Sequence, residues 1–291
     1  MARRKPSKVH GVVVVDKPAG VTSHDVVGMA RKELGERRVG HSGTLDPDAT
    51  GVLLLGVGRA TRLMRFMTML EKTYTTEIVF GTTTDTLDDS GEVIAHHDTS
   101  RIAPEAVAQA AAGLTGSIMQ VPPMVSAVKV GGRRLHELAR EGIEVERQAR
   151  PVEVYSFSTE PTDDPLVYRA TVRCGSGTYV RVLAADLGQA LGSGAHLRNL
   201  RRTRIGSFDQ AQASAPGQLE LLAVEAAVRD HARIEVDADE AQRIVHGAHL
   251  SSPPIGDGPW GVFSPDGALL AVHERDDAGR VKPGVVLAQS N

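Results

Sequence analysis

Short apolar segments that end at glycine or proline recur along this chain, and they constrain its fold more than any other feature. The first is the β-branched run 12–15, which ends at a turn-forming stretch, 16–20. Further strand-like segments lie at 52–57, 74–80, 152–157 and 167–174. Segments of helical periodicity lie between them, at 27–34, 61–70, 104–114, 135–141 and 179–191. This alternation, with no repeat of about 20–50 residues, argues against a solenoid and predicts a mixed α/β fold.

Composition excludes several classes of protein. With 291 residues, 41% of them hydrophobic and 24% charged, the chain has the composition of a globular protein with a sizeable core. A single cysteine, Cys174, permits neither a disulfide framework nor a cysteine-rich zinc site. The apolar run after the charged residues 1–8 is too short for a signal peptide or a membrane span. We therefore expect a cytoplasmic protein.

Charge is distributed unevenly along the chain. Residues 1–204 carry 27 Lys and Arg against 23 Asp and Glu, whereas residues 205–291 carry 6 against 13. The asymmetry indicates two regions with different roles and favours a polyanionic partner for the first. On charge alone, an uneven solvated surface explains the pattern equally well.

The densest motif is Gly40-His-Ser-Gly-Thr-Leu-Asp-Pro-Asp-Ala-Thr-Gly51. It lacks the Gly-Lys-Ser/Thr ending of a phosphate-binding loop. Its glycines allow close backbone approach and Pro47 fixes the chain after Asp46, which suits a rigid turn presenting a carboxylate as nucleophile or base. A turn whose aspartates hydrogen-bond their own backbone is the alternative from these residues alone.

Several motifs in matching order and spacing resemble the TruB family of bacterial tRNA pseudouridine-55 synthases, over about residues 9–205. The resemblance rests on the Gly40–Gly51 motif together with Gly11-Val-Val-Val-Val-Asp-Lys-Pro-Ala-Gly-Val-Thr-Ser-His24, Lys72-Thr-Tyr74, Thr84-Asp-Thr86, Val121-Pro-Pro-Met-Val-Ser-Ala-Val-Lys129, Cys174-Gly-Ser-Gly-Thr-Tyr-Val-Arg181 and Gly194-Ala-His-Leu-Arg-Asn-Leu-Arg-Arg202. It implies isomerisation of uridine 55 in the TΨC loop of tRNA to pseudouridine, on a base taken out of its stack.

The resemblance also implies a fold. It is a pseudouridine-synthase catalytic domain over 1–232, mixed α/β (α+β), with a central, mostly antiparallel sheet. A mobile thumb-like segment is inserted at about 101–146, and a helical connection spans about 210–232. A small PUA-like β module follows at 233–291, although its acidic balance is unusual for an RNA-binding domain.

Three residues are implied as catalytic. The Leu-Asp-Pro element assigns the nucleophile to Asp46, while the family pattern requires no acid at Asp48. Tyr74 would stack on the flipped base and move a proton at C5. Arg181 would pair with Asp46 and keep it ionised.

The resemblance places further residues around the substrate. His41, Tyr74, Tyr179 and Leu200 would contact the substrate. Asp85 could join the Asp46–Arg181 charge network, and a hydrogen-bonded local turn is an equally weighted alternative for it. Two basic clusters suit phosphate contacts, because they flank catalytic motifs and the second has no acid nearby. The clusters comprise Lys129, Arg133, Arg134 and Arg140, and Arg198, Arg201, Arg202 and Arg204.

We expect the partner to be the tRNA T-arm stem-loop, with no membrane, no obligatory protein partner and a monomeric enzyme. No metal and no cofactor is expected, because isomerisation within one substrate needs none. Two alternatives stay open: a guide-dependent pseudouridine synthase of the same superfamily, and an RNA chaperone without catalysis. The intact Asp46, Tyr74 and Arg181 argue against the chaperone, and the self-contained motif arrangement favours the standalone enzyme.

Overall fold

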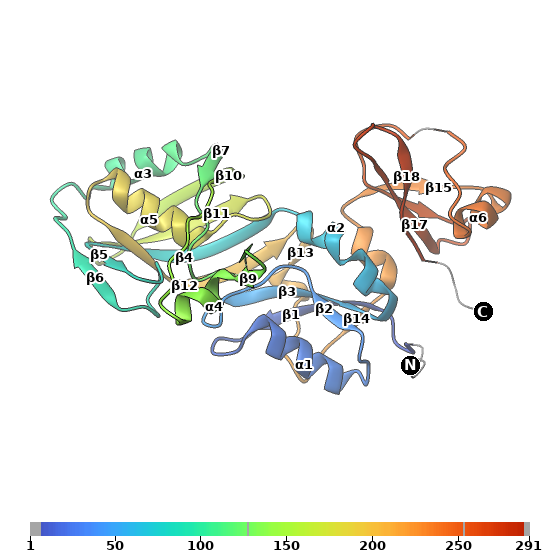
Figure 1. The fold of residues 1–291 in the computed structure, drawn as a ribbon, viewed down its shortest axis with the longest axis horizontal. Helices are drawn as coiled ribbons and strands as arrows, with labels where there is room; N and C mark the ends of the chain where they lie inside the picture. Colours follow the sequence, from blue (N-terminus) through green and yellow to red (C-terminus); the bar gives the residue numbers. More distant parts are fainter. Residues whose placement is uncertain (1–6, 127, 253, 288–291) are drawn as a thin grey trace.

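A ten-stranded sheet, counted over the described residues, forms the centre of the catalytic part (Figure 1). The computed structural model describes residues 7–287 apart from 127 and 253. The strand order is β14-β1-β3-β12-β4-β11-β10-β7, with β2 on β3 and β13 on β12. These strands are β1 (Gly11–Lys17), β2 (Val39–His41), β3 (Thr50–Val57), β4 (Lys72–Phe80), β7 (Gly116–Gln120), β10 (Arg150–Pro161), β11 (Val167–Cys174), β12 (Ala195–Ile205), β13 (Phe208–Asp209) and β14 (Leu221–Leu222).

Strand direction confirms the predicted fold class. Only β12 and β3 pair in parallel, with Arg201 opposite Thr50, and the other pairings of this sheet are antiparallel. Two small hairpins lie apart from the sheet. They are formed by β5 (Thr82–Thr84) with β6 (Val93–His96), and by β8 (Lys129–Val130) with β9 (Arg133–Arg134).

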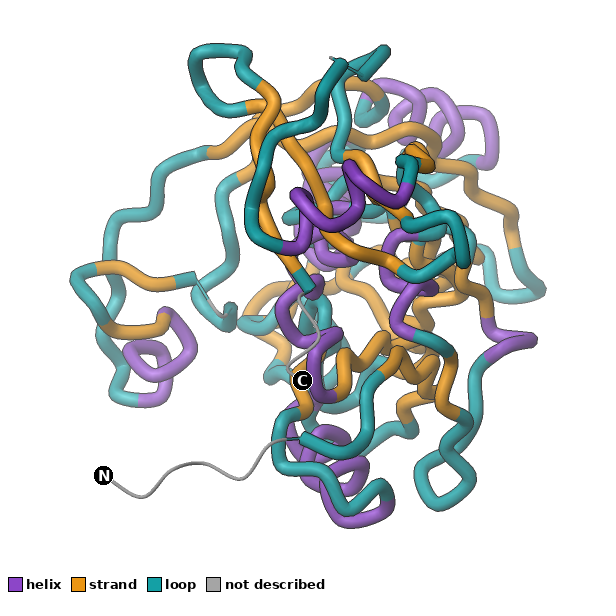
Figure 2. Tube along the Cα trace, turned by 90° about the vertical axis from the view of Figure 1, so that its right-hand side faces the viewer, coloured by secondary structure: helices purple, strands orange, loops and turns teal. Residues whose placement is uncertain are grey.

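Short helices lie around the strands (Figure 2), and the buried apolar residues form separate core clusters. Helices α3 (Pro104–Gly113) and α5 (Val180–Ala190) bury apolar residues against β4, β10 and β11. Helix α1 (Ser23–Glu33) packs on β1 and β3, and begins at a capping box formed by Thr22 and Asp25. Apolar residues of α2 (Met64–Met69), which follows the 3₁₀ helix η1 (Gly58–Leu63), pack in a third cluster.

The C-terminal module is a four-stranded sheet carrying one helix. Its elements are β15 (Ala232–Glu235), α6 (Ala238–Val245), β16 (Trp260–Phe263), β17 (Leu269–Arg275) and β18 (Val281–Val286). Apolar residues of this module share a core cluster with α2. At the same junction Arg65 pairs with Glu274 at 2.6 Å, and Arg62 donates to the Val286 carbonyl at 2.6 Å. The small β module expected at the C-terminus is therefore present.

The connection at 210–232 differs from the helical expectation. It forms the 3₁₀ helices η2 (Gln210–Gln212) and η3 (Val224–Val228), with β14 between them. β14 pairs with β1 and forms the edge of the sheet, so sheet hydrogen bonds satisfy its backbone where a helix was expected. Tertiary pairing overrides helix propensity here.

The segment 101–146 is not a single projecting thumb. Its first part forms α3, whose Val107 and Ala111 are fully buried, and β7, which adds to the sheet along β10. The hairpin β8–β9 and helix α4 (Leu135–Arg140) follow beyond β7. The first part is therefore built into the catalytic core, because its apolar residues find partners there.

Across the described part of the chain, we find no helix with the length and apolar character that crossing a membrane requires.

Candidate active site

Asp46 lies on a loop that the N-terminal motif clamps in place. The hydroxyl of Ser23, at the start of α1, accepts a hydrogen bond from the Leu45 amide (2.9 Å) and donates one to the Leu45 carbonyl (3.0 Å). On the other side, the fully buried ammonium of Lys17 donates to the Pro47 carbonyl at 2.8 Å. Both neighbours of Asp46 are thus fixed by side chains from residues 11–24.

Lys17 is an unusual residue to bury. Its ammonium also donates to the carbonyls of Pro18 (2.9 Å) and Val21 (2.7 Å), so all three of its protons have acceptors. Burial lowers the pKa of Lys17 to about 8, while the nearby Asp48 and Asp46 oppose the change. The lysine therefore ties the two motifs together and places positive charge behind the catalytic loop.

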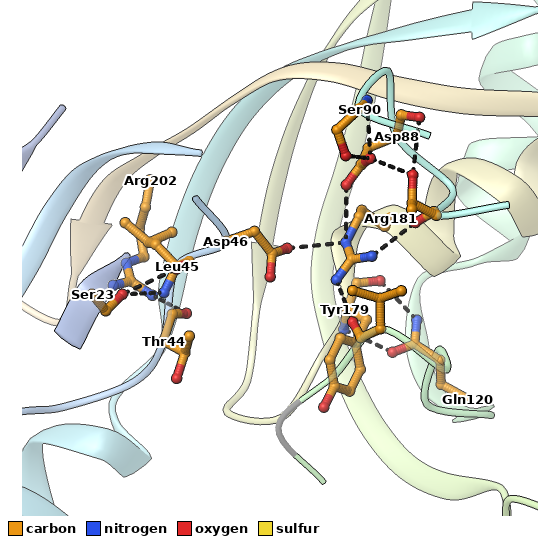
Figure 3. A network of polar contacts seen from close by, with 12 residues as sticks. Ser23, Thr44, Leu45, Asp46, Asp88, Ser90, Gln120, Tyr179, Arg181 and Arg202 are labelled. Carbon is orange, nitrogen blue, oxygen red and sulfur yellow. Dashed lines mark hydrogen bonds and ion pairs between the residues drawn. The ribbon is translucent and has the colours of Figure 1, made fainter. Parts of the chain in front are cut away.

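Arg181 lies between two carboxylates at the N-terminal end of α5 (Figure 3). Its Nε lies 3.0 Å from Asp46 Oδ2 and 3.5 Å from Asp88 Oδ2. Its two Nη atoms donate to the carbonyls of Thr86 and Val125, each at 2.8 Å. With 3% of its surface exposed and four partners, this guanidinium has one orientation.

Asp88, rather than Asp85, occupies the position predicted for a further acid. Its Oδ1 accepts from the hydroxyls of Thr86 and Ser90, both at 2.6 Å, which aims Oδ2 at Arg181. The Asp85 carboxylate instead accepts from the Glu92 amide at 2.9 Å, within its own turn. Of the two alternatives for Asp85, the structure therefore shows the local turn, and this turn directs the carboxylate of the residue three positions later toward Arg181.

The environment of Asp46 tunes its charge in opposite directions. Burial raises the pKa of Asp46, the Arg181 charge opposes that rise, and the Asp88 charge adds to it. The side chain nevertheless remains 40% exposed. The group is therefore a carboxylate whose ionisation depends on Arg181 and whose oxygens stay accessible.

The predicted catalytic and base-contacting residues meet at one cavity of about 230 Å³. It is lined by Asp46, Tyr74, Tyr179, Arg181 and Leu200, as the sequence predicted. Leu200 reaches it from a register irregularity in β12, between residues 198 and 201. Lys72 and Arg202 line the same cavity, so it combines aromatic and apolar walls with buried cations.

The two tyrosines are held differently. Tyr74 is buried on β4, and burial raises the pKa of its phenol. Tyr179 is the N-cap of α5, and its backbone is held by Gln120, whose amide accepts from Tyr179 N (2.8 Å) and donates to Tyr179 O (3.1 Å). Gln120 carried no signal in the sequence, because its role comes from the pairing of β7 with β10.

His41 is not among the cavity-lining residues. It ends β2, and its imidazole is half-buried. Burial lowers the pKa of His41, and the Arg202 charge adds to that effect. A neutral imidazole can contact RNA through hydrogen bonding or stacking, so a role outside the cavity stays a prediction.

The candidate phosphate-binding arginines fall into two groups. Arg198 pairs with Glu77 at 2.6 Å and Arg201 with Asp16 at 2.9 Å, and both remain partly exposed. Arg133 pairs with Glu141 in the exposed segment that also carries Lys129 and Arg134. Arg202, in contrast, is 1% exposed and points into the protein. The expectation that Arg202 contacts phosphate was therefore wrong, because strand alternation places it on the opposite face from Arg201.

Three family models match successive parts of the chain. The model of the TruB family pseudouridylate synthase N-terminal domain matches residues 31–180, a model described as tRNA pseudouridylate synthase B C-terminal domain matches 181–237, and one described as tRNA pseudouridine synthase II, C terminal, matches 231–288.

Two relatives are similar in sequence over nearly the whole chain. A protein of Thermobifida fusca (strain YX) named tRNA pseudouridine synthase B is 47% identical, covering 96% of this chain and 99% of the relative. A protein of the same name from Arthrobacter sp. (strain FB24) is 44% identical, covering 97% of each chain.

A solved structure shares the fold. In a crystal structure of a Cbf5-Nop10-Gar1 complex, one chain aligns with a TM-score of 0.71 at 23% identity, over 97% of this chain and 84% of that one. Because the family models match along residues 31–288 and the relatives are 44–47% identical over nearly the whole chain, the chain belongs to the TruB family of pseudouridylate synthases.

Proposed function

We propose that this protein isomerises uridine 55 in the TΨC loop of tRNA to pseudouridine, with Asp46 as the nucleophile. The observation that supports this most directly is the Asp46 carboxylate, held 3.0 Å from the buried Arg181 at a cavity also lined by Tyr74 and Leu200. The relatives named tRNA pseudouridine synthase B support tRNA as the substrate.

The cavity suits a uracil base taken out of its stack. A cavity of about 230 Å³ is large enough to take a pyrimidine ring and to let it turn. Tyr74 offers an aromatic face to the ring, and Leu200 offers an apolar surface on which it can rest. Extrusion of the base is required because the reacting C1′ and C5 atoms are otherwise inaccessible in the folded loop.

The chemistry follows from the position of Asp46. Its carboxylate oxygen attacks C1′, and the electron pair of the glycosidic bond leaves with uracil N1. The freed base turns within the cavity, and C5 bonds to C1′ as the carboxylate leaves. Tyr74, ionised to the phenolate, takes the proton from C5, the C5–H electron pair returns to the ring, and N1 takes up a proton from solvent.

Arg181 has two roles in this scheme. It keeps Asp46 ionised before attack, and it fixes which carboxylate oxygen faces the substrate, because Nε holds Oδ2. Asp88 in turn pairs with the same Nε of Arg181, at 3.5 Å. The charge network therefore positions the nucleophile as well as tuning its charge.

The surrounding surface supports a polyanionic partner. Lys129, Arg133, Arg134, Arg198 and Arg201 are at least partly exposed and are proposed phosphate contacts for the T arm. We further propose a cytoplasmic monomer, with residues 1–232 as the catalytic domain and 233–291 as the second domain. His41 is proposed to contact RNA beside the cavity.

The test is tritium release from tRNA labelled at uridine C5, followed by mapping of pseudouridine in the product. The wild-type protein should release one tritium per tRNA and modify only position 55, whereas Asp46→Asn should release none and still bind tRNA. A tRNA with cytidine at position 55 is the matched substrate control. Modification elsewhere, or full activity of Asp46→Asn, would overturn the proposal.

A further inference from the structure

Arg202 is a buried cation at the meeting point of three strands. It lies on β12 opposite Tyr74 of β4 and opposite Gly51 of β3. Its Nε donates to the Val52 carbonyl at 2.7 Å, Nη2 to Gly43 at 3.2 Å and Nη1 to Thr44 at 3.5 Å. Gly43 and Thr44 belong to the loop that leads into Asp46.

Burying the Arg202 charge costs desolvation free energy, so its presence here suggests a functional role. The ion pairs found among the described residues do not include Arg202, which is held mainly by hydrogen bonds to three backbone carbonyls, with a further side-chain interaction with the Tyr74 phenol. A guanidinium held mainly by neutral dipoles retains most of its positive field in a medium of low dielectric constant. An apolar side chain would fill the same volume without that desolvation cost.

The charge acts on the inner wall of the cavity. The Arg202 guanidinium carbon lies 6.0 Å from the centre of the Tyr74 ring, and both residues line the cavity. Burial raises the pKa of the Tyr74 phenol, and Arg202 opposes that rise. Two further groups, Cys174 on β11 and Asp46 on the loop, face this phenol and act against its ionisation.

We propose that Arg202 is a positioning residue for the isomerisation: it holds the loop segment that carries Asp46 and stabilises negative charge on Tyr74. The proposal rests on the proposed function for its reaction, and on the contacts of Arg202 for its geometry. It gives Arg202 a task distinct from that of Arg201, which lies on the exposed face of the same strand. Arg202 acts through the loop and Tyr74, and not by binding phosphate.

Three substitutions separate charge from hydrogen-bond geometry. Arg202→Lys keeps the charge but cannot reach all three carbonyls, Arg202→Gln removes the charge, and Arg173→Gln is the control. Arg173 lies on β11, which β4 separates from β12, is partly exposed and pairs with Glu71 at 3.5 Å. Circular dichroism and thermal unfolding identify the variants that are folded.

Single-turnover isomerisation at saturating tRNA is the first readout. Loss of loop geometry should slow Arg202→Gln by about 100-fold, and Arg202→Lys by less. Affinity for tRNA and its salt dependence should stay at the wild-type values for both, and Arg173→Gln should match the wild type in rate. A reduced salt slope with an intact rate would overturn the proposal and restore a phosphate contact.

The second readout does not need catalysis. With only four tyrosines in the chain, ¹³C labelling at Tyr Cζ yields four resonances, and Tyr74→Phe assigns the relevant one. The titration midpoint of Tyr74 should rise in Arg202→Gln and stay near the wild-type value in Arg202→Lys. An unchanged midpoint in folded Arg202→Gln would overturn the electrostatic role. Because this titration is measured on the protein without tRNA, it tests the effect of Arg202 on Tyr74 even if the proposed tRNA reaction proves wrong.

Discussion

Arg181→Met tests how far the Asp46 nucleophile depends on its neighbouring cation. Methionine keeps much of the apolar stem but removes the guanidinium whose Nε lies 3.0 Å from Asp46 Oδ2. Burial and Asp88 already raise the pKa of Asp46, and Arg181 is the main opposing influence. Removing it should therefore raise that pKa further.

The size of the effect follows from distance and exposure. Opposite charges about 4 Å apart attract by about 4 kcal/mol at an effective dielectric constant near 20. Because the Asp46 side chain is 40% exposed, solvent screening reduces the attraction between the two charges to about 1–2 kcal/mol. That corresponds to a pKa rise of about one unit.

The assay is single-turnover isomerisation of one tRNA across a pH series. The ionised carboxylate is the active form, so activity is lost as pH falls through the pKa of Asp46. In Arg181→Met this acid limb should move up by about one pH unit, with a rate about tenfold lower at a fixed pH within the limb. Lost orientation lowers the rate at all pH values, so recovery at high pH should be partial.

A second substitution isolates the role of Asp88. Since the Asp88 charge raises the pKa of Asp46, the double variant Arg181→Met with Asp88→Asn should move the acid limb back toward lower pH. Arg173→Met serves as the surface-arginine control and should leave the limb in place. If Arg181→Met slows the reaction while the acid limb stays fixed, Arg181 orients Asp46 without governing its ionisation, and the electrostatic argument is refuted.

Three other changes probe the same site. Asp46→Asn should abolish tritium release while tRNA affinity stays within a few-fold, and Asp48→Asn should retain most activity; the reverse order would move the nucleophile to Asp48. Tyr74→Phe should bind tRNA normally but stall at the C5 proton, and Tyr74→Leu should also lose stacking, as quench-flow kinetics with a fluorescent tRNA would show; a Phe variant as fast as the wild type leaves only a stacking role. Lys17→Met removes the hydrogen bonds that the Lys17 ammonium donates to the Pro47 carbonyl and to two other carbonyls. It should lower the free energy of unfolding in urea by about 1–3 kcal/mol and slow isomerisation. An unchanged unfolding midpoint would show that the contact between Lys17 and the Asp46 loop is dispensable.

Much of the site was predictable because its chemistry is local in sequence. The Leu-Asp-Pro element distinguishes Asp46 from Asp48 within one loop, and the structure places Asp46 beside Arg181. Strand periodicity likewise located β4 and β11, which carry Tyr74 and lead into Arg181. Hydrophobic patterning and turn residues act over a few positions, so the chain itself records them.

The direction of a side chain was decided only by tertiary pairing. Arg201 and Arg202 are adjacent and chemically identical, yet one pairs with Asp16 near the surface and the other lies buried behind the catalytic loop. Irregularities in the register of β12 determine which face each residue takes, and a shift of one position would exchange them. The sequence of residues 198–204 does not reveal that register.

The partners of Arg181 and Tyr179 show the same limit. Asp85 and Asp88 share one acidic turn, and only the folded turn selects Asp88, while Gln120 reaches Tyr179 from a strand 59 positions away. The sequence by itself determined the family and the order of the main elements and predicted Asp46 as the nucleophile, because these depend on residue type and near neighbours. The tertiary structure decided which buried groups meet, because such contacts depend on strand register and backbone geometry across distant segments.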